Sequence, residues 1–251
     1  MGVDYGFAME VEVMRDLMLA VAKRCPGGKL PENYIILDSE TTGTDIKQAA
    51  VLQWGFCVVE QRKPRANFST YVKRPSSLQI DPMALKIHGI DHAVLEKHGE
   101  DPYEVMSAVI ENLEAWRRRG FMFSGHNLLR FDAELLEREA KELGLHFRFG
   151  DNEVIDTGML VKASQLGLPF KDKDSLRSYY ERVSNVRATV KWSLDRHCIK
   201  HYKLARFVSQ DVIDKAHDAA IDTLLTHHLF EVMRDTVFGG PCALREAHTN
   251  V

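Results

Sequence analysis

Cysteines are few in this sequence, and they are widely spaced. The four, Cys25, Cys57, Cys198 and Cys242, include no C-x-x-C pair. Cysteine-rich zinc sites and the disulfide frameworks of small secreted domains both place cysteines at short, repeated spacings. The pattern indicates neither, and we expect a reducing compartment, the cytoplasm.

Long apolar runs are also missing. No segment approaches the roughly 20 apolar residues of a membrane-spanning helix, so we expect no membrane partner. The N-terminal segment carries acidic residues that a secretory signal would not tolerate: Asp4, Glu10, Glu12 and Asp16. The sequence has no internal repeat, low-complexity tract or evident linker. We therefore expect a soluble, unprocessed protein.

Strong net charge is absent too, because the 251 residues sum to only −3. The distribution is nevertheless uneven. Residues 171–206 contain ten Lys or Arg and four Asp or Glu, an excess of +6 that leaves −9 for the remainder. With Trp192, Tyr179, Tyr180 and Tyr202 interleaved, this segment is a candidate surface for phosphates and bases. A solvated basic helix face with buried tyrosines explains the pattern equally well.

The periodicity of apolar residues predicts an α/β protein with a mixed five-stranded sheet flanked by helices and an extra N-terminal helix. Strands are expected near 33–37, 50–59, 67–73, 121–124 and 153–156, and helices near 7–23, 83–88, 93–97, 102–119, 131–143, 157–166 and 218–234. We divide the chain into an N-terminal helical extension packed on the same domain (1–32), a main domain (33–236) and a C-terminal tail (237–251).

Two acidic residues end the first expected strand. Asp38 and Glu40 are two apart, so their side chains point to the same face. A solvated acidic turn would explain a lone D-x-E. The preceding apolar run, 34–37, instead places these acids at the end of a core strand, where open α/β sheets bind ligands. Two carboxylates there can share one cation.

A second stretch, 126–132, follows the strand at 121–124. Asp132 begins a helix, so taken alone it fits a helix N-terminal acid as well as a metal ligand. His126 and Asn127 lie in the same strand-to-helix turn and receive a supporting role. Phe131 could stack on a base, although an aromatic residue just before a helix is more often core.

The third stretch holds His217, Asp218 and Asp222. Five residues of α-helix separate His217 from Asp222 by more than a full turn, which puts them on different faces. If Asp222 lies in the first turns of the last helix, His217 must precede it on a loop. Asp218 shares the face of Asp222, but its position suits a helix N-cap. We favour His217 and not Asp218 as the chemical residue.

These three motifs resemble those of the DEDDh branch of the DnaQ-like 3′-to-5′ exonuclease superfamily, which has a ribonuclease-H-like fold. The matching stretches are 38–43, 127–132 and 217–222, and the similarity extends over roughly 33–231, with Ile87-His88-Gly89-Ile90 and Ser193 through Cys198 between the motifs. The leading helix and the basic stretch around 171–191 look longer than compact members require.

The resemblance implies a two-metal active site. Asp38, Glu40 and Asp222 would bind one cation, Asp38 and Asp132 a second, and His217 would accept the proton of the attacking water. All-oxygen ligation favours Mg²⁺ or Mn²⁺. Relatives of this kind contact the terminal nucleotide with the turn after the first acidic pair, which here is Thr41 and Thr42.

The function implied is a metal-dependent exonuclease that releases nucleoside 5′-monophosphates from single-stranded 3′ ends, with DNA favoured over RNA, either freestanding or proofreading for a polymerase. The alternative within this class is an exoribonuclease that trims RNA 3′ ends. A different class is an accessory protein, because residues 165–170 (QLGLPF) resemble a sliding-clamp docking peptide. A helix end followed by a Gly-Pro turn also explains those residues.

Overall fold

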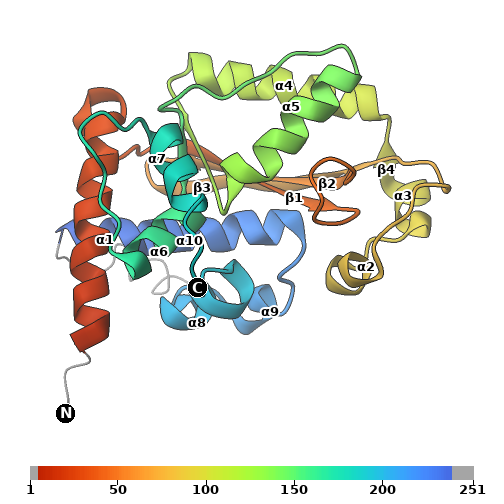
Figure 1. Ribbon diagram of the computed structural model, residues 1–251. Coiled ribbons are helices and arrows are strands. Elements are labelled where there is room, and N and C mark those ends of the chain that lie inside the picture. Colours follow the sequence, from red (N-terminus) through yellow and green to blue (C-terminus); the bar gives the residue numbers. More distant parts are fainter. Residues whose placement is uncertain (1–4, 239–251) are drawn as a thin grey trace.

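A six-stranded sheet forms the centre of the computed structural model, in which residues 5–238 are described (Figure 1). The strand order is β4-β3-β2-β1-β5-β6. The strands are β1 (Tyr34–Thr41), β2 (Val51–Glu60), β3 (Lys63–Val72), β4 (Gly99–Glu100), β5 (Met122–Gly125) and β6 (Val154–Asp156). β1, β2 and β3 pair antiparallel, whereas β5 and β6 continue the sheet in parallel from β1.

The predicted fold class, a mixed sheet flanked by helices, is confirmed, but the predicted count of five strands is wrong. The additional strand is β4, whose two residues pair in parallel with Tyr71 and Val72 of β3. A two-residue strand that contains glycine has no periodicity for a sequence pattern to detect. It exists only because the chain passes the edge of β3.

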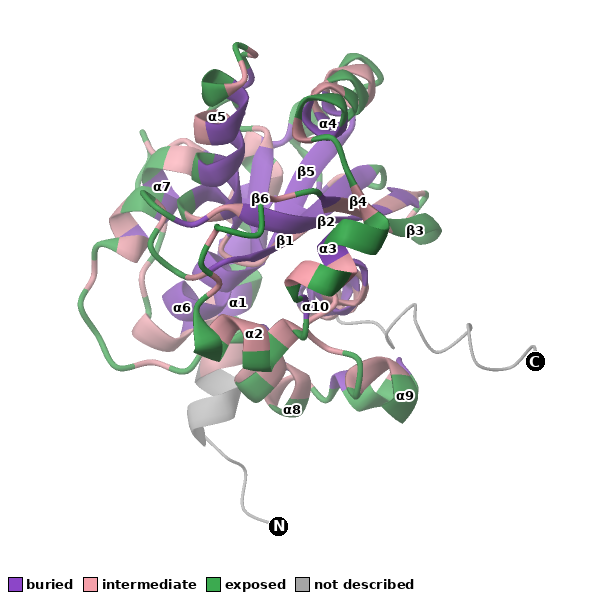
Figure 2. Cartoon of the chain, turned by 90° about the vertical axis from the view of Figure 1, so that its right-hand side faces the viewer, coloured by how far each residue is buried: buried purple, intermediate pink, exposed green. Residues whose placement is uncertain are grey.

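Helices cover both faces of the sheet (Figure 1). α4 (Pro102–Arg118) and α5 (Asp132–Glu142) lie on one face, and α1 (Tyr5–Arg24), α6 (Thr157–Leu166) and α10 (Ala219–Phe238) on the other. The shorter helices are α2 (Pro82–His88), α3 (His92–His98), α7 (Leu176–Ser184), α8 (Ile199–His201) and α9 (Gln210–Ile213). Figure 2 shows the buried residues concentrated in the sheet and the inner faces of these layers.

The central strand explains why the core forms where it does. Residues 34–37 of β1 are Tyr-Ile-Ile-Leu, and each is at most 1% exposed. A strand covered on both faces needs such a continuous apolar run rather than an alternating one. Asp38 and Ser39 are partly exposed, and Glu40 and Thr41 at the end of the strand are buried again, where β1 contacts α5 and α10. The polar end of β1 is therefore positioned by the buried apolar residues that precede it in the same strand.

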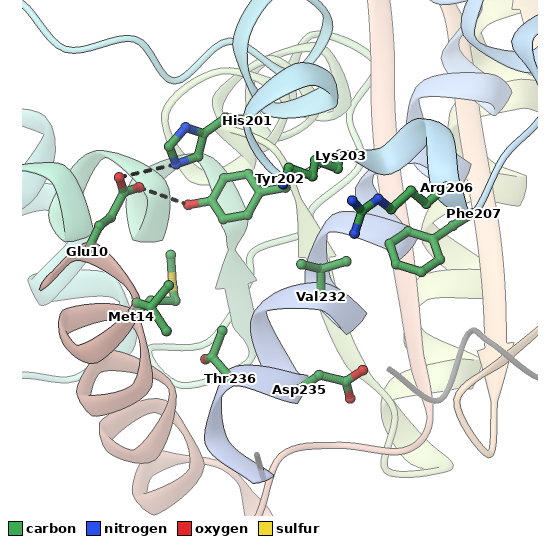
Figure 3. Close-up of a pocket in the computed structure, with 11 residues that line it drawn as sticks. Glu10, Met14, His201, Tyr202, Lys203, Arg206, Phe207, Val232, Asp235 and Thr236 are labelled. Carbon is green, nitrogen blue, oxygen red and sulfur yellow. Dashed lines mark hydrogen bonds and ion pairs between the residues drawn. The ribbon is translucent and has the colours of Figure 1, made fainter. Parts of the chain in front are cut away.

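The leading helix packs against α10 and α6 through Met14, Leu17, Met18 and Val21, all buried. Near its start, Glu10 accepts a hydrogen bond from the Tyr202 hydroxyl (3.3 Å) and lies 3.2 Å from His201 Nε2. These contacts join α1 to the end of α8 and the residue after it, across a cavity of about 320 Å³ (Figure 3). No residue of the three acidic motifs lines this cavity, although Tyr202 of the basic segment does.

Within residues 5–238, no helix combines the length and hydrophobicity that a membrane crossing requires. From residue 239 onward, the predicted C-terminal tail lies outside the described residues.

Candidate active site

The carboxyl end of β1 carries the first two acids. Asp38 stands opposite Gly55 of β2, and Glu40 opposite Gln53. Being two apart on one strand, Asp38 and Glu40 share a face, as their spacing predicts. Glu40 is buried, whereas Asp38 is partly exposed.

Asp132 reaches this edge through the parallel pairing of β1 with β5. The chain leaves β5, makes a short 3₁₀ turn over residues 128–130 and begins α5 at Asp132. Because β1 and β5 run in the same direction, the turn after β5 meets the end of β1. The hydroxyl of Ser39, on β1 between the two acids, donates a 2.5 Å hydrogen bond to Asp132 Oδ1. Asp132 is 4% exposed.

The third motif lies at the start of α10, which packs against β1 and β2. Asp222 lies in its first turn. His217 precedes the helix with φ 76°, and its backbone N–H donates to Asp222 Oδ1 (3.2 Å). The Asp218 side chain accepts from the N–H groups of Ala220 and Ile221 (3.0 and 3.3 Å), so it caps the helix. Ligand atoms of Glu40, His217 and Asp222 all lie within 4.8 Å of one another.

Crowding of these acids perturbs their titration. Burial, followed by the negative charges of Asp132, Asp222 and Glu40, raises the pKa of Asp38 well above its usual range. Burial and the charge of Asp222 raise the pKa of Glu40 to about 9. Burial is also the main cause that raises the pKa of Asp132 to about 7 and that of Asp222 to about 6. The protein itself does not stabilise the ionised forms of these acids, so without a cation they hold their protons to higher pH than usual.

Divalent cations suit this donor set. Clustered carboxylate oxygens are the ligands that Mg²⁺ and Mn²⁺ take in proteins. Among the described residues, the group close enough to hold one ion together is Glu40, His217 and Asp222. Asp38 and Asp132 are not members of that group. They lie near it, because, besides burial, the charges of Asp132, Asp222 and Glu40 all raise the pKa of Asp38. The residues present thus fit a metal centre.

His217 also has a partner that the sequence did not assign. Its Nε2 lies 3.5 Å from Oδ2 of Asp195, in the turn of π-helix formed by Leu194–Cys198. The hydrogen bond that His217 donates to the Asp195 carboxylate, opposed by burial and aided by the charge of Asp222, raises the pKa of His217 above its usual value. The same hydrogen bond lowers the pKa of Asp195. The resemblance of residues 193–198 to the exonuclease superfamily includes Asp195, but it assigns this residue no role.

Gln53 and His88 support the site and were likewise missed. Gln53 Oε1 accepts from the N–H of Ala219 (3.1 Å) and its Nε2 donates to Asp218 Oδ2 (3.1 Å), which fixes the start of α10 beside β2. His88 accepts at Nδ1 from the N–H of Ile90, so its Nε2–H is available to donate to the carbonyl of Thr41 (3.2 Å). Gln53 pairs with Glu40 across β1 and β2, a register that only the folded sheet reveals.

The predicted nucleotide contacts have intramolecular partners. Thr41 Oγ1 donates to the carbonyl of Gly43 (2.7 Å), and Thr42 Oγ1 accepts from the N–H of Ala50 (2.9 Å); both residues are buried. Asn127 has φ 71° and donates its backbone N–H to Asp156 Oδ1 (2.9 Å). Its side-chain oxygen is buried and has no hydrogen-bond partner within the described chain. Phe131 packs against the core while remaining partly exposed.

The aromatic residues of the basic segment divide into two groups. Tyr179 and Tyr180 are at most 1% exposed, so they cannot stack on a base and the buried alternative holds for them. Trp192 and Tyr202 are only partly buried.

The clamp-like stretch 165–170 is engaged within the protein. Phe170 stacks on Tyr179 with ring centroids 3.5 Å apart, and the Arg24 guanidinium lies 4.3 Å from its ring centre. Leu168 packs against the core, and Gln165 bonds to the backbone of Lys191. A docking peptide needs these side chains free, so the contacts favour the alternative of a helix end and turn.

Comparison with known proteins gives a family and a fold. The profile of the RNase_T family, described as exonuclease, matches residues 35–230. A structure of E. coli exonuclease I in complex with a dA16 oligonucleotide superposes with a TM-score of 0.60 at 18% identity, covering 83% of this chain and 42% of that one.

Two other structures of exonuclease I have a similar fold. One, described as suggesting how processivity is achieved, gives a TM-score of 0.59 at 17% identity over 82% of this chain and 41% of that one. A product-bound structure gives a TM-score of 0.55 at 15% identity and covers 82% of this chain and 44% of that one. The chain thus spans about two fifths of the length of these proteins. No curated protein matches the sequence significantly.

Proposed function

The chain belongs to the RNase_T exonuclease family, within the DEDDh (DnaQ-like) superfamily, and from this premise we propose that it is a metal-dependent exonuclease that degrades single-stranded DNA from the 3′ end. The products are nucleoside 5′-monophosphates. The observation that carries the proposal is the convergence of Glu40, His217 and Asp222 within 4.8 Å, beside Asp38 and Asp132, from three separate parts of the sequence.

Each residue has a role that follows from its chemistry. Asp38, Glu40, Asp132 and Asp222 hold two divalent cations, Mg²⁺ or Mn²⁺. When bound, these cations lower the pKa of water and neutralise charge on the phosphate. His217 accepts the proton that the attacking water loses, because an imidazole that titrates near neutrality is an effective general base. Asp195 orients the imidazole through Nε2.

Recognition of the 3′ end falls to the residues around β1. In this proposal Thr41 and Thr42 position the terminal nucleotide chiefly through the backbone, since their hydroxyls already have partners. His88 holds the carbonyl of Thr41 in place. Asn127 and the exposed part of Phe131 line the approach from the second motif.

Single-stranded DNA is favoured because the structural neighbour exonuclease I is described in complex with a dA16 oligonucleotide. RNA remains the second candidate within the same chemistry, since a carboxylate metal site does not distinguish the two sugars.

The test uses a single-stranded 20-mer labelled at its 5′ end, with a matched duplex and an RNA of the same sequence, in Mg²⁺, Mn²⁺ or EDTA. A ladder of shortening labelled products in metal, and none in EDTA, supports the proposal. Immediate release of a labelled mononucleotide would indicate attack from the 5′ end and contradict it. Asp222→Asn serves as the matched inactive control.

A further inference from the structure

An open cavity of about 500 Å³ lies over the basic segment. Its lining is Val190, Lys191, Trp192, Ser193, Arg196 and His197. Lys191 and Arg196 are exposed, and the Trp192 ring is half-buried. An aromatic ring beside cations is the combination that binds a base and its phosphate in single-stranded nucleic acids.

The backbone of this lining is fixed by other parts of the protein. Residues 186–193 have no regular secondary structure. The Gln165 amide of α6 accepts from the N–H of Lys191 (3.2 Å) and donates to its carbonyl (2.7 Å). The Trp192 carbonyl lies 2.6 Å from His126 Nε2 and accepts from Cys198 Sγ (3.4 Å). The Trp192 ring is thus presented in a defined place although its own segment is irregular.

His126 also supports the ring itself. The imidazole and the indole stack with centroids 5.9 Å apart and planes 27° apart. Burial, opposed by the hydrogen bond to the Trp192 carbonyl, lowers the pKa of His126 to about 4, so the imidazole is neutral at pH 7. Because His126 lies in the turn after β5, this contact joins the cavity to the second acidic motif.

A second chain of contacts leads from the cavity to the catalytic histidine. Arg196 lines the cavity, and its Nε lies 3.4 Å from Asp195 Oδ2. The same carboxylate oxygen is 3.5 Å from His217 Nε2. One carboxylate, that of Asp195, therefore contacts both a residue of the cavity and the catalytic histidine.

We propose that Lys191, Trp192 and Arg196 form a subsite for a nucleotide on the 5′ side of the cleaved bond, with its base against the indole and its phosphate beside the two cations. This inference rests on the proposed function, because it needs a nucleic-acid strand in the site. It adds a binding position upstream of the scissile bond, supplied by the irregular segment before the π-helix.

The test compares a substrate that is long enough to occupy the subsite with one that is too short to reach it. A single-stranded 16-mer extends into it, whereas the p-nitrophenyl ester of thymidine 5′-monophosphate does not. For Trp192→Ala we expect the KM for the 16-mer to rise by about tenfold, since stacking on an aromatic ring contributes about 1–3 kcal/mol per base. For Lys191→Ala we expect a smaller rise of this KM, because one phosphate contact is lost. The kcat for the 16-mer and both constants for the ester should stay within twofold.

Two further measurements separate binding from structural damage. Trp192→Phe should keep most of the affinity because it retains a stacking face. Lys191→Ala should reduce the dependence of log KM on log salt concentration by about 0.7, the value for one phosphate contact on a single strand. Lys63→Ala, which removes an exposed cation of β3, is the matched control and should change neither quantity.

The outcomes are distinguishable. An unchanged KM for the 16-mer in Trp192→Ala and Lys191→Ala overturns the subsite, and so does an equal rise of KM for the ester, which would mean a structural effect on the metal site. Wild-type protein that hydrolyses neither substrate in Mn²⁺ overturns the proposed function instead. Should Trp192→Ala fail to fold, Trp192→Phe and Lys191→Ala still decide.

Discussion

Nε2 of His217 lies 3.5 Å from Oδ2 of Asp195, although the two residues are 22 positions apart and Asp195 belongs to the π-helical turn Leu194–Cys198. The carboxylate holds the imidazole of a residue whose backbone has φ 76° and belongs to no helix or strand. His217 is therefore oriented by a contact outside its own motif.

Asp195→Asn should lower kcat for a single-stranded oligonucleotide on the order of tenfold, because the imidazole loses both orientation and basicity. Asp195 raises the pKa of His217, so the acid limb of the kcat profile should move to lower pH in the variant. The pH dependence of single-turnover rates in Mg²⁺ measures both effects. A limb that stays in place, or moves upward, would show that Asp195 does not act on His217.

Without metal, the acidic site should make the protein less stable as pH rises. The folded protein keeps protons on Glu40 and Asp132, whose pKa values are raised to about 9 and about 7, while the unfolded chain loses them near about pH 4. Stability from these groups is thus complete at low pH and lost progressively as pH rises through the raised values. In EDTA, the free energy of unfolding should be lower at pH 8 than at pH 5.

Adding Mn²⁺ at pH 8 should reverse that loss, by about 2.7 kcal/mol when its concentration is 100 times the dissociation constant. Glu40→Gln should lose most of this stabilisation and flatten the profile in EDTA. Glu142→Gln, a change at an exposed acid of α5, is the control. Urea unfolding at both pH values tests this; equal stabilisation of wild type and Glu40→Gln by Mn²⁺ would contradict it.

The buried His227 should make the protein sensitive to acid. The Tyr34 hydroxyl donates to Glu231 Oε1 (2.8 Å), so it accepts from His227 Nδ1–H (2.8 Å), and the ring is neutral. Burial and the neighbouring His228 lower the pKa of His227 to about 3. Its contribution to stability is therefore present above about pH 6.5 and lost as pH falls toward 3, by up to about 1.4 kcal/mol per pH unit.

His227→Asn, which retains a donor near the position of Nδ1, should be less stable than wild type at pH 7. The difference between the two proteins should narrow as pH falls from 6.5 to 4, because the variant has no imidazole to protonate. Comparing both proteins at each pH cancels the titration of the acidic site. Parallel stability curves would be inconsistent with a neutral, buried His227.

Gly55→Ala should damage both stability and activity. A Cβ at Gly55 would lie 2.2 Å from the carbonyl carbon and 2.3 Å from the carbonyl oxygen of Ala219, so the start of α10 would have to move. Overpacking of this kind costs about 1–3 kcal/mol or more. Because Gly55 faces Asp38 and Ala219 lies between His217 and Asp222, kcat should fall more than stability alone explains.

Gly150→Ala is the control for Gly55→Ala, since its Cβ would meet only the flexible side chain of Glu153 at 3.0 Å. Thermal unfolding together with kcat at a temperature where both variants are folded tests the prediction. Wild-type kcat in Gly55→Ala would mean that the close approach of α10 to β2 does not set the geometry of the site.

The sequence by itself determined the elements and the chemistry. The apolar run at 34–37 and the helical spacing before Arg234 required a buried strand and a long final helix, because burial is the only way to satisfy such patterns. Helical geometry also separated His217 from Asp222 and assigned Asp218 to a cap. These inferences depend on local spacing, which a chain carries wherever it folds.

Only the tertiary structure decided which distant residues meet. Asp195, Gln53 and Ser39 reach their partners through register and packing that no local pattern encodes. The two-residue β4 likewise exists only through its pairing with β3. The structure also separated the buried Tyr179 and Tyr180 from the accessible Trp192, which the basic segment had presented together. Such contacts join residues that are far apart in the sequence, so they follow from the whole chain and not from any one stretch of it.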